Sequence, residues 1–231
     1  MLDLFPEGFA EERDGDRVEL VAFTDEAGER RARAAFGDVG VSPFASGWED
    51  EWKRFHVPSV VGGLWVGPPW AEAPEGLTPI VIDPGRAFGT GGHATTRLCL
   101  ELLCDLERGS VLDVGCGSGV LAISAAKLGF APVAALDAEE TAVEATRSNA
   151  RLNHVTVDVR RGDALAEPLP RADVVLANLD LATVRALASR LECRLTVTSG
   201  YDEGERPHLA GLRHLERRHR EGWAADLYAR E

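Results

Sequence analysis

Short apolar runs alternate with segments of helical spacing through the last two thirds of the chain. The run 111–114 is apolar and rich in β-branched residues, and 120–128 places good helix formers at helical spacing, which predicts a strand followed by a helix. Further strands are expected at 80–83, 133–137, 155–160, 173–177, 195–199, 213–220 and 223–229. Strands that alternate with helices predict an α/β fold. From residue 111 onwards we expect a seven-stranded, doubly wound, mostly parallel sheet that ends in an antiparallel hairpin.

The first part of the chain is patterned more weakly. Residues 17–23 alternate as a strand, 26–36 have helical composition, and 39–41 form a short extended piece. Residues 48–55 are aromatic and charged, which is typical of a connecting helix, and 57–70 predict a short β pair with turns. We therefore expect three parts: a small acidic α+β portion over 1–47, a linker over 48–78, and an α/β domain over 79–231.

A glycine-rich turn, with glycines at 115, 117 and 119, joins the strand 111–114 to the next helix. Glycine lets the backbone approach a ligand closely. The dinucleotide fingerprint would place its third glycine at the sixth position of the motif, with a pyrophosphate on the helix N-terminus. Here the third glycine, Gly119, stands at the fifth position, and Val120 is sixth. A cofactor without phosphates needs only close backbone packing, so the turn favours S-adenosylmethionine over a dinucleotide.

Asp137 ends the next apolar run, 22 residues after Gly115. A carboxylate at the carboxyl end of a second parallel strand can accept hydrogen bonds from both ribose hydroxyls. The alternative is that Asp137 caps the helix expected near Glu139. The two roles are compatible at this corner of the sheet.

The loop between Asp83 and Thr96 holds four glycines within eight residues. Ordering so many glycines is costly in chain entropy, which favours a loop folded against a ligand. The loop directly precedes the helix 97–106, which leads to the glycine turn, so it can close over the cofactor pocket. The alternative is a flexible surface turn in which Thr95 or Thr96 caps the helix.

Over about residues 48–231 the chain resembles the PrmA-type ribosomal-protein methyltransferases. The likeness rests on the string DPGRAFGTGGHATT at 83–96, followed by the turn at 111–119. It implies a class I methyltransferase-like fold, S-adenosylmethionine as the cofactor, and a protein substrate. That family trimethylates amino groups of the eleventh large-subunit ribosomal protein, and its N-terminal domain recognises this substrate.

The resemblance also assigns cofactor contacts. By matching the family's loop and turn motifs, it points to Phe88, His93, Thr96, Gly115, Asp137 and Asn178. From the same loop and turn, and from the position after the strand 155–160 where an adenine amino group would lie, we add Thr90, Gly117 and Asp163.

Asn178 is the expected catalytic residue, because its side-chain oxygen can orient the neutral amine of an acceptor lysine. The family has a small apolar pair and an alanine after this asparagine, whereas this chain reads Leu179-Asp180-Leu181. Two roles are open for Asp180: it could remove the proton of the amine, or it could cap the following helix, which its residue type favours.

Charge narrows the class of partner. The net charge is −13, and residues 1–52 contain 14 acidic residues against 5 arginines. Such a surface disfavours contacts with nucleic-acid phosphates and favours a basic protein substrate, in line with a ribosomal protein. The alternative is that the acidic residues only keep a small domain soluble.

Other sequence features predict absences. No run of 18 uncharged apolar residues and no charged-then-apolar leader occurs, so we expect a soluble, cytoplasmic protein without a membrane partner. The four cysteines have neither pairing nor metal spacing and are expected as reduced core residues. The six histidines form no helical or strand-spaced pair, so we expect no metal site.

Three functions are therefore weighed. The first is an S-adenosylmethionine-dependent protein N-methyltransferase. The second is a small-molecule methyltransferase of the same fold, favoured if the N-terminal part forms a lid over a closed pocket. The third is a non-catalytic cofactor-binding protein, favoured if Asn178 does not face the methyl group.

Overall fold

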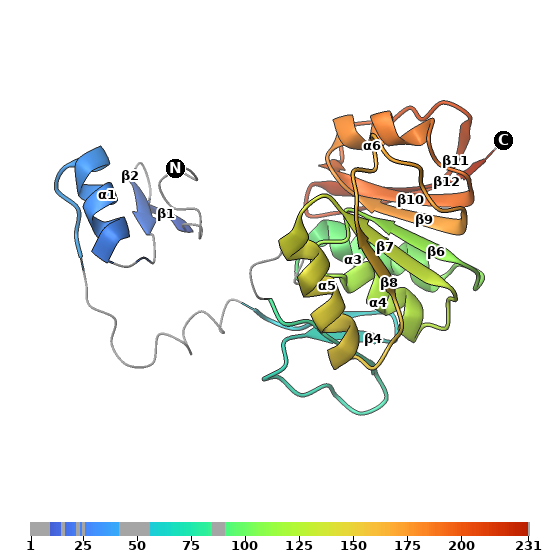
Figure 1. Ribbon diagram of the computed structural model, residues 1–231, viewed down its shortest axis with the longest axis horizontal. Coiled ribbons are helices and arrows are strands. Elements are labelled where there is room, and N and C mark those ends of the chain that lie inside the picture. Colours follow the sequence, from blue (N-terminus) through green and yellow to red (C-terminus); the bar gives the residue numbers. More distant parts are fainter. Residues whose placement is uncertain are drawn as a thin grey trace. The chain divides into compact units, whose positions relative to one another are not determined.

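The structure, a computed structural model, describes residues 10–14, 17–21, 24, 26–41, 56–84 and 91–230. The chain divides into two compact units, Met1–Trp52 and Lys53–Glu231 (Figure 1). A two-stranded sheet belongs to the first unit, and a three-stranded and a seven-stranded sheet belong to the second.

The first unit contains a hairpin and a helix. Strands β1 (Ala10–Asp14) and β2 (Arg17–Val21) pair antiparallel. Helix α1 (Glu26–Phe36) has the predicted bounds, and Arg33 Nε lies 2.9 Å from Glu29 Oε1 one turn away. The apolar pattern does not predict β1, because Ala10 is its one apolar residue. The connecting helix predicted at 48–55 lies outside the described residues.

The seven-stranded sheet of the second unit confirms the predicted fold class. Its order is β11-β12-β10-β9-β6-β7-β8. The strands are β6 (Val111–Val114), β7 (Val133–Asp137), β8 (Asp158–Arg161), β9 (Ala172–Asn178), β10 (Cys193–Asp202), β11 (Leu212–Arg220) and β12 (Trp223–Arg230). From β8 to β10 the neighbours pair parallel, whereas β12 pairs antiparallel with both β10 and β11. The chain therefore reverses strand order between β6 and β9, and ligands bind at such a switch point.

Helices cover both faces of this sheet. On one face, helices α3 (Ala94–Cys104), α4 (Val120–Lys127) and α5 (Glu140–Leu152) pack on a core that includes Val174 and Leu176. On the other face, α6 (Leu181–Ala188) packs on cores formed by the alternate side chains, such as Val175 and Tyr201. Burial on both faces explains why these strands are continuous apolar runs.

A three-stranded sheet precedes the cofactor loop. It comprises β3 (Ser59–Val61), β4 (Leu64–Gly67) and β5 (Thr78–Val81). The strand predicted at 80–83 is thus β5, and it pairs with β4 rather than with the large sheet. Part of the segment predicted as a linker forms β3 and β4, whose Val61, Leu64 and Val66 are buried in the core of the second unit.

Candidate active site

The glycine turn follows β6 at the carboxyl end of the sheet. Gly115, Gly117 and Gly119 all have positive φ angles, of 71°, 53° and 84°. A Cβ on Gly119 would lie 2.7 Å from Thr146 Cγ2, and one on Gly115 would collide with the Leu179 side chain. Backbone conformation and close packing therefore both require glycine here. The Leu179 and Thr146 side chains occupy the places that a Cβ on Gly115 and on Gly119 would need.

Asp137 joins this turn to the next strand. Its Oδ2 accepts a hydrogen bond from the Gly117 N–H at 3.0 Å, and its Oδ1 accepts one from the Glu139 N–H at 3.0 Å. The N-cap of α5 is Glu139, so the alternative in which Asp137 caps that helix is wrong. Each carboxylate oxygen retains a second lone pair for another donor.

Asp113, in the middle of β6, is a buried carboxyl group that was not among the predicted site residues. Its Oδ2 accepts from the Ala122 N–H at 3.1 Å, in the first turn of α4, where the N-cap Gly119 has no side chain to do so. Burial, above all, raises the pKa of Asp113 to about 7. The Ala122 hydrogen bond lowers this pKa, and the charge of Asp137 raises it further. A carboxylate inside an apolar run was the signal for this residue in the sequence.

A polar stripe, formed by Thr146 and Asn149 of α5 and by Asn153 at its C-cap, connects the parts of the site. Thr146 Oγ1 donates to the Gly117 carbonyl at 2.9 Å, and Asn149 Nδ2 donates to the Ser118 carbonyl at 2.9 Å. Asn153 makes the hydrogen bonds to β5 that the backbone of a neighbouring strand would otherwise make. Its Oδ1 accepts from the Val81 N–H and its Nδ2 donates to the Val81 carbonyl. All three side chains are buried.

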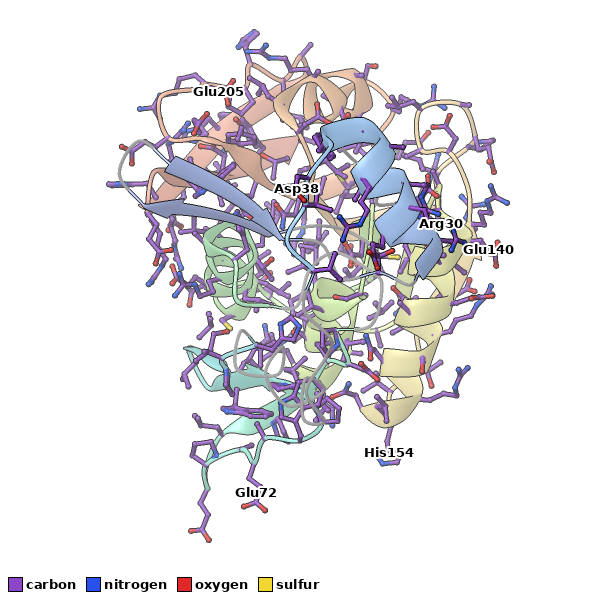
Figure 2. All side chains as sticks on the ribbon, turned by 90° about the vertical axis from the view of Figure 1, so that its left-hand side faces the viewer. Arg30, Asp38, Glu72, Glu140, His154 and Glu205 are labelled. Carbon is purple, nitrogen blue, oxygen red and sulfur yellow. The ribbon has the colours of Figure 1, made fainter. Side chains whose placement is uncertain are left out.

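This stripe was missed in the sequence prediction, although its spacing of three and four residues places its members on one helix face. Polar residues on the inner face of an amphipathic helix were the signal. Figure 2 labels Glu140 at the start of α5 and His154 just beyond its end, and the stripe lies between them.

The loop predicted to cover the cofactor is anchored at both ends. At its start, the Asp83 N–H donates to Asn149 Oδ1 at 3.0 Å. At its end, the Gly91 carbonyl accepts from Ser59 Oγ at 3.1 Å, and Gly91 packs so closely on Val66 of β4 that a Cβ would collide with it. Phe88 and Thr90 lie outside the described residues.

His93 caps α3 and is linked to Asn178. The Thr95 N–H donates to His93 Nδ1 at 3.4 Å, so the alternative in which Thr95 or Thr96 caps this helix is wrong. His93 Nδ1 also lies 2.8 Å from Thr95 Oγ1, which accepts from Asn178 Nδ2 at 3.2 Å. The ring of His93 meets that of Trp223 edge-on, with centroids 4.9 Å apart.

Asn178 ends β9 and is half-buried. Its Nδ2 also lies 3.5 Å from Thr96 Oγ1, so Asn178, Thr96 and His93 form one cluster through buried Thr95. Among the described residues, none donates a hydrogen bond to Asn178 Oδ1. That acceptor is therefore available, while the Thr95 and Thr96 hydroxyls hold the amide in place.

Asp180 is the N-cap of α6, as its residue type predicted. Its Oδ1 accepts from the Ala182 and Thr183 N–H groups, both at 3.0 Å, and its Oδ2 accepts from Thr183 Oγ1 at 2.5 Å. The Thr183 hydroxyl, above all, holds the pKa of Asp180 below its ordinary value. This cap accounts for the aspartate that departs from the family pattern.

Asp163 lies at the same edge of the sheet but is exposed. Its Oδ1 accepts from the Leu165 N–H at 2.8 Å, and its own N–H donates to Glu167 Oε1 at 3.0 Å. The neighbouring Gly162 N–H donates a hydrogen bond to the Asp137 carbonyl at 2.9 Å. This bond keeps Asp163 near Asp137 at the edge of the sheet.

The predicted residues thus fall into two neighbouring groups. In the first group a hydrogen bond joins Gly117 to Asp137, and Gly115 belongs to the same turn as Gly117; Thr96, His93 and Asn178 form the second group. Leu179 connects the groups, because it follows Asn178 and its side chain covers Gly115. Within the described ranges, no three His, Cys, Asp or Glu side chains are placed to hold a metal ion.

Comparisons with known proteins point to one family. Residues 28–201 match the family model described as Ribosomal protein L11 methyltransferase (PrmA). A protein of that name from Legionella pneumophila (strain Lens) is 39% identical over 194 residues, or 77% of this chain and 66% of that protein. Another of that name, from Pelobacter propionicus, is 38% identical over 247 residues, or 96% of this chain and 80% of that protein.

A solved structure agrees in fold. The ribosomal protein L11 methylase from Lactobacillus delbrueckii subsp. bulgaricus is 26% identical, with a TM-score of 0.65 over 73% of this chain and 94% of that one. The chain spans only 66% of the length of the Legionella relative and 57% of one from Haemophilus influenzae.

Proposed function

Because this chain belongs to the ribosomal protein L11 methyltransferase (PrmA) family, we propose that it transfers methyl groups from S-adenosylmethionine to amino groups of a ribosomal protein. The observation that carries this proposal is the pair of residue groups at the carboxyl edge of the sheet. One group suits a nucleoside cofactor without phosphates, and the other suits an acceptor amine.

The glycine turn and Asp137 fit S-adenosylmethionine. Positive φ angles at three glycines fold this turn, and a ribose and a methionine tail can pack against its backbone surface beside the Leu179 and Thr146 side chains. Asp137 is half-buried beside this surface and has lone pairs free for the ribose hydroxyls. Asp163, on the next strand end, is assigned to the adenine, and Phe88, Thr90, His93 and Thr96 are assigned to the loop side of the pocket. When bound, the cofactor supplies an activated sulfonium methyl group.

Asn178 is assigned to the acceptor. A lysine amine, with an ordinary pKa of about 10.4, must be neutral to act as a nucleophile. Transfer from water to the half-buried surroundings of Asn178 favours the neutral form. The Asn178 carboxamide, held by the Thr95 and Thr96 hydroxyls, offers its free Oδ1 to an amine N–H and so fixes the direction of the nitrogen lone pair. Orientation of this kind is the main contribution that such a site makes to the rate.

Asp180 is not assigned to proton removal. Both of its oxygens accept hydrogen bonds within α6, and its lowered pKa makes it a weak base. The proton of the acceptor amine is therefore assigned to solvent.

The proposed substrate is a basic ribosomal protein, as the names of the relatives suggest. The acidic residues concentrated in 1–52 would attract such a partner electrostatically. A cytoplasmic location, where ribosomal proteins are found, and the absence of nucleic-acid or membrane partners belong to the same proposal. Among the described helices, none is long and apolar enough to span a membrane.

The proposal is tested by incubating the full chain with methyl-labelled S-adenosylmethionine and either purified L11-type ribosomal protein or a small-molecule extract free of protein. We expect label on amino groups of the ribosomal protein, and less label with Asn178→Ala. Label confined to the small-molecule fraction would favour the small-molecule methyltransferase. Cofactor binding without transfer to either fraction would favour the non-catalytic alternative.

A further inference from the structure

A pocket on the α6 face of β11 and β12 shares no lining residue with the proposed methyl-transfer site. Its volume is about 300 Å³, near the lower end of the range for small-molecule sites. The polar side chains that line it are Arg206, His208, His214, Arg217, Asp226 and Tyr228. Residues 206–209 belong to the segment that leads from β10 to β11, and Figure 2 labels Glu205 at the start of this stretch.

Asp226, which lines this pocket, is fully buried and has three polar partners, of which Arg217 is the cation. Its Oδ2 accepts from the Tyr201 hydroxyl at 2.8 Å and from Arg217 Nη1 at 3.3 Å, and its Oδ1 lies 2.7 Å from His214 Nε2. Burial raises the pKa of Tyr201, which keeps this phenol a donor. The carboxylate therefore has partners on both oxygens and repels a second anion much less than an unpaired carboxylate would.

Two β-bulges create this convergence. Leu215 is the extra residue between His214 and Glu216, so His214 and Arg217 share the face of Asp226 although they are three residues apart. The second register shift lies between Ser199 and Tyr201 on β10, and it turns Tyr201 onto the same face. Bulges that redirect side chains are found preferentially at functional sites. Two bulges around one buried carboxylate indicate a specific binding site rather than an incidental depression of the surface.

The mouth of the pocket carries unused positive charge. Arg206 and His208 are exposed, and neither side chain makes a hydrogen bond or ion pair with any described residue. Arg217 is anchored to the Glu203 and Glu205 carbonyls, at 3.0 and 2.7 Å, and so keeps its charge beside the pocket. The two arginines and one aspartate of the lining, Arg206, Arg217 and Asp226, have formal charges that sum to +1. This charge is opposite in sign to the −13 of the whole chain.

The remaining walls are apolar, since Pro207, Leu209 and Leu212 complete the lining. Guanidinium and imidazole donors recognise carboxylates through short, charge-assisted hydrogen bonds. We propose that this pocket binds a carboxylate that carries a short apolar chain. Arg206 and His208 bind the carboxylate, and Leu209 and Leu212 contact the apolar chain. Such a group belongs either to a free aliphatic acid or to the C-terminal residue of a polypeptide. This inference does not depend on the proposed methyl transfer.

The test is a titration of the full chain with a small probe molecule, in which the NMR signals of the His208 and His214 rings report binding. The probes are hexanoate and its neutral analogue hexanamide. We expect hexanoate to shift both rings and hexanamide to leave them unchanged. Arg206→Ala should weaken hexanoate binding about tenfold. Arg213→Ala, which removes an exposed arginine of β11 that does not line the pocket, should not weaken it.

A second arm distinguishes the two sources of the carboxylate. The peptide Gly-Gly-Gly-Leu, with a free C-terminus or as its amide, replaces the aliphatic acid. Tighter binding of the free peptide than of hexanoate identifies a polypeptide terminus, and the reverse order identifies a free acid. Equal binding of acid and amide, or equal effects of Arg206→Ala and Arg213→Ala, would overturn the proposal.

Discussion

The side chain of Asn149 accepts a hydrogen bond of 3.0 Å from the backbone N–H of Asp83, which lies 66 residues earlier in the chain. The same carboxamide donates to the Ser118 carbonyl at 2.9 Å, within the glycine turn. One buried side chain on α5 thus connects the start of the loop 83–96 to the turn after β6. Both segments of the proposed cofactor site depend on this residue for their relative position.

We predict that Asn149→Ala lowers both stability and cofactor affinity. The substitution removes the hydrogen bonds of Asn149 with the Asp83 N–H and the Ser118 carbonyl, at a cost of about 2 kcal/mol in the free energy of unfolding. Urea denaturation and calorimetry with S-adenosylmethionine measure the two effects. The matched control is Arg151→Ala, an exposed residue on the same helix, which should change neither. An unchanged affinity for S-adenosylmethionine in Asn149→Ala would show that the hydrogen bonds of Asn149 do not determine the shape of the cofactor site.

We predict that Asp137→Ala weakens S-adenosylmethionine binding at least about tenfold, because two hydrogen bonds to a charged group would be lost at roughly 1.5 kcal/mol each. The variant should still fold, since the Gly117 and Glu139 N–H groups lie near solvent at the sheet edge. Calorimetry measures the affinity and circular dichroism checks the fold. Glu140→Gln removes a neighbouring exposed charge and should bind as the unaltered chain does. Full affinity in a folded Asp137→Ala would remove Asp137 from the cofactor site.

We predict that Asn178→Ala lowers the turnover number much more than it lowers cofactor affinity, because its proposed contact is with the acceptor amine. Single-turnover rates and calorimetry separate the two quantities. Thr183→Ala, which removes the Thr183 hydroxyl bonded to Asp180 nearby on α6, serves as the control and should leave turnover nearly unchanged. Equal losses of turnover and affinity in Asn178→Ala would make Asn178 a cofactor contact alone.

We predict that Asp113 makes the protein less stable as pH rises from about 4 to 7. In this window the folded state holds a proton on Asp113, whose pKa is raised to about 7, while the unfolded chain has lost it. The contribution of Asp113 to the free energy of unfolding falls by no more than about 1.4 kcal/mol per pH unit, and it is constant above the pKa of the folded state. Urea midpoints for Asp113→Asn should decline less steeply between pH 5 and 7 than those of the unaltered chain. Exposed Asp158→Asn is the control, and parallel pH profiles for Asp113→Asn and the unaltered chain would contradict the prediction.

Local patterns in the sequence were sufficient for the large sheet and the glycine turn. Val111–Val114 and the glycines after it are contiguous, and their strand, turn and helix follow from composition over a dozen residues. Asp180 was predicted correctly as a cap for the same reason, since capping depends on neighbours in the chain.

Contacts between distant segments were not predictable in this way. The bonds of Asn149 and Asn153 to the strand and loop near residue 82 depend on how α5 packs, which a periodic pattern does not specify. The apolar run at 80–83 likewise indicated a strand, but not that it would pair with β4 in a separate sheet. His93 took the capping role that the alternative interpretation gave to Thr95 or Thr96, because α3 begins at Ala94 and the residue before it is His93.

The last prediction concerns the acidic first unit. A chain that starts near Trp48 should still bind S-adenosylmethionine, because every residue assigned to the cofactor lies after Pro84. If residues 1–47 recruit a basic protein, this chain should methylate the ribosomal protein more slowly. Methylation by the full chain should also weaken as salt rises, since exposed charges are screened beyond about 8 Å at physiological ionic strength. Binding is measured by calorimetry and methylation with labelled cofactor at several salt concentrations.

Two outcomes separate recruitment from solubility. Recruitment requires that truncation and salt act on the same step, so the truncated chain should lose most of its salt dependence along with its rate. If the truncated chain methylates the ribosomal protein as fast as the full chain, with the same response to salt, the acidic residues of 1–47 have no part in binding the substrate. Their charge would then act only through solubility, because repulsion between like-charged molecules opposes association whatever the substrate.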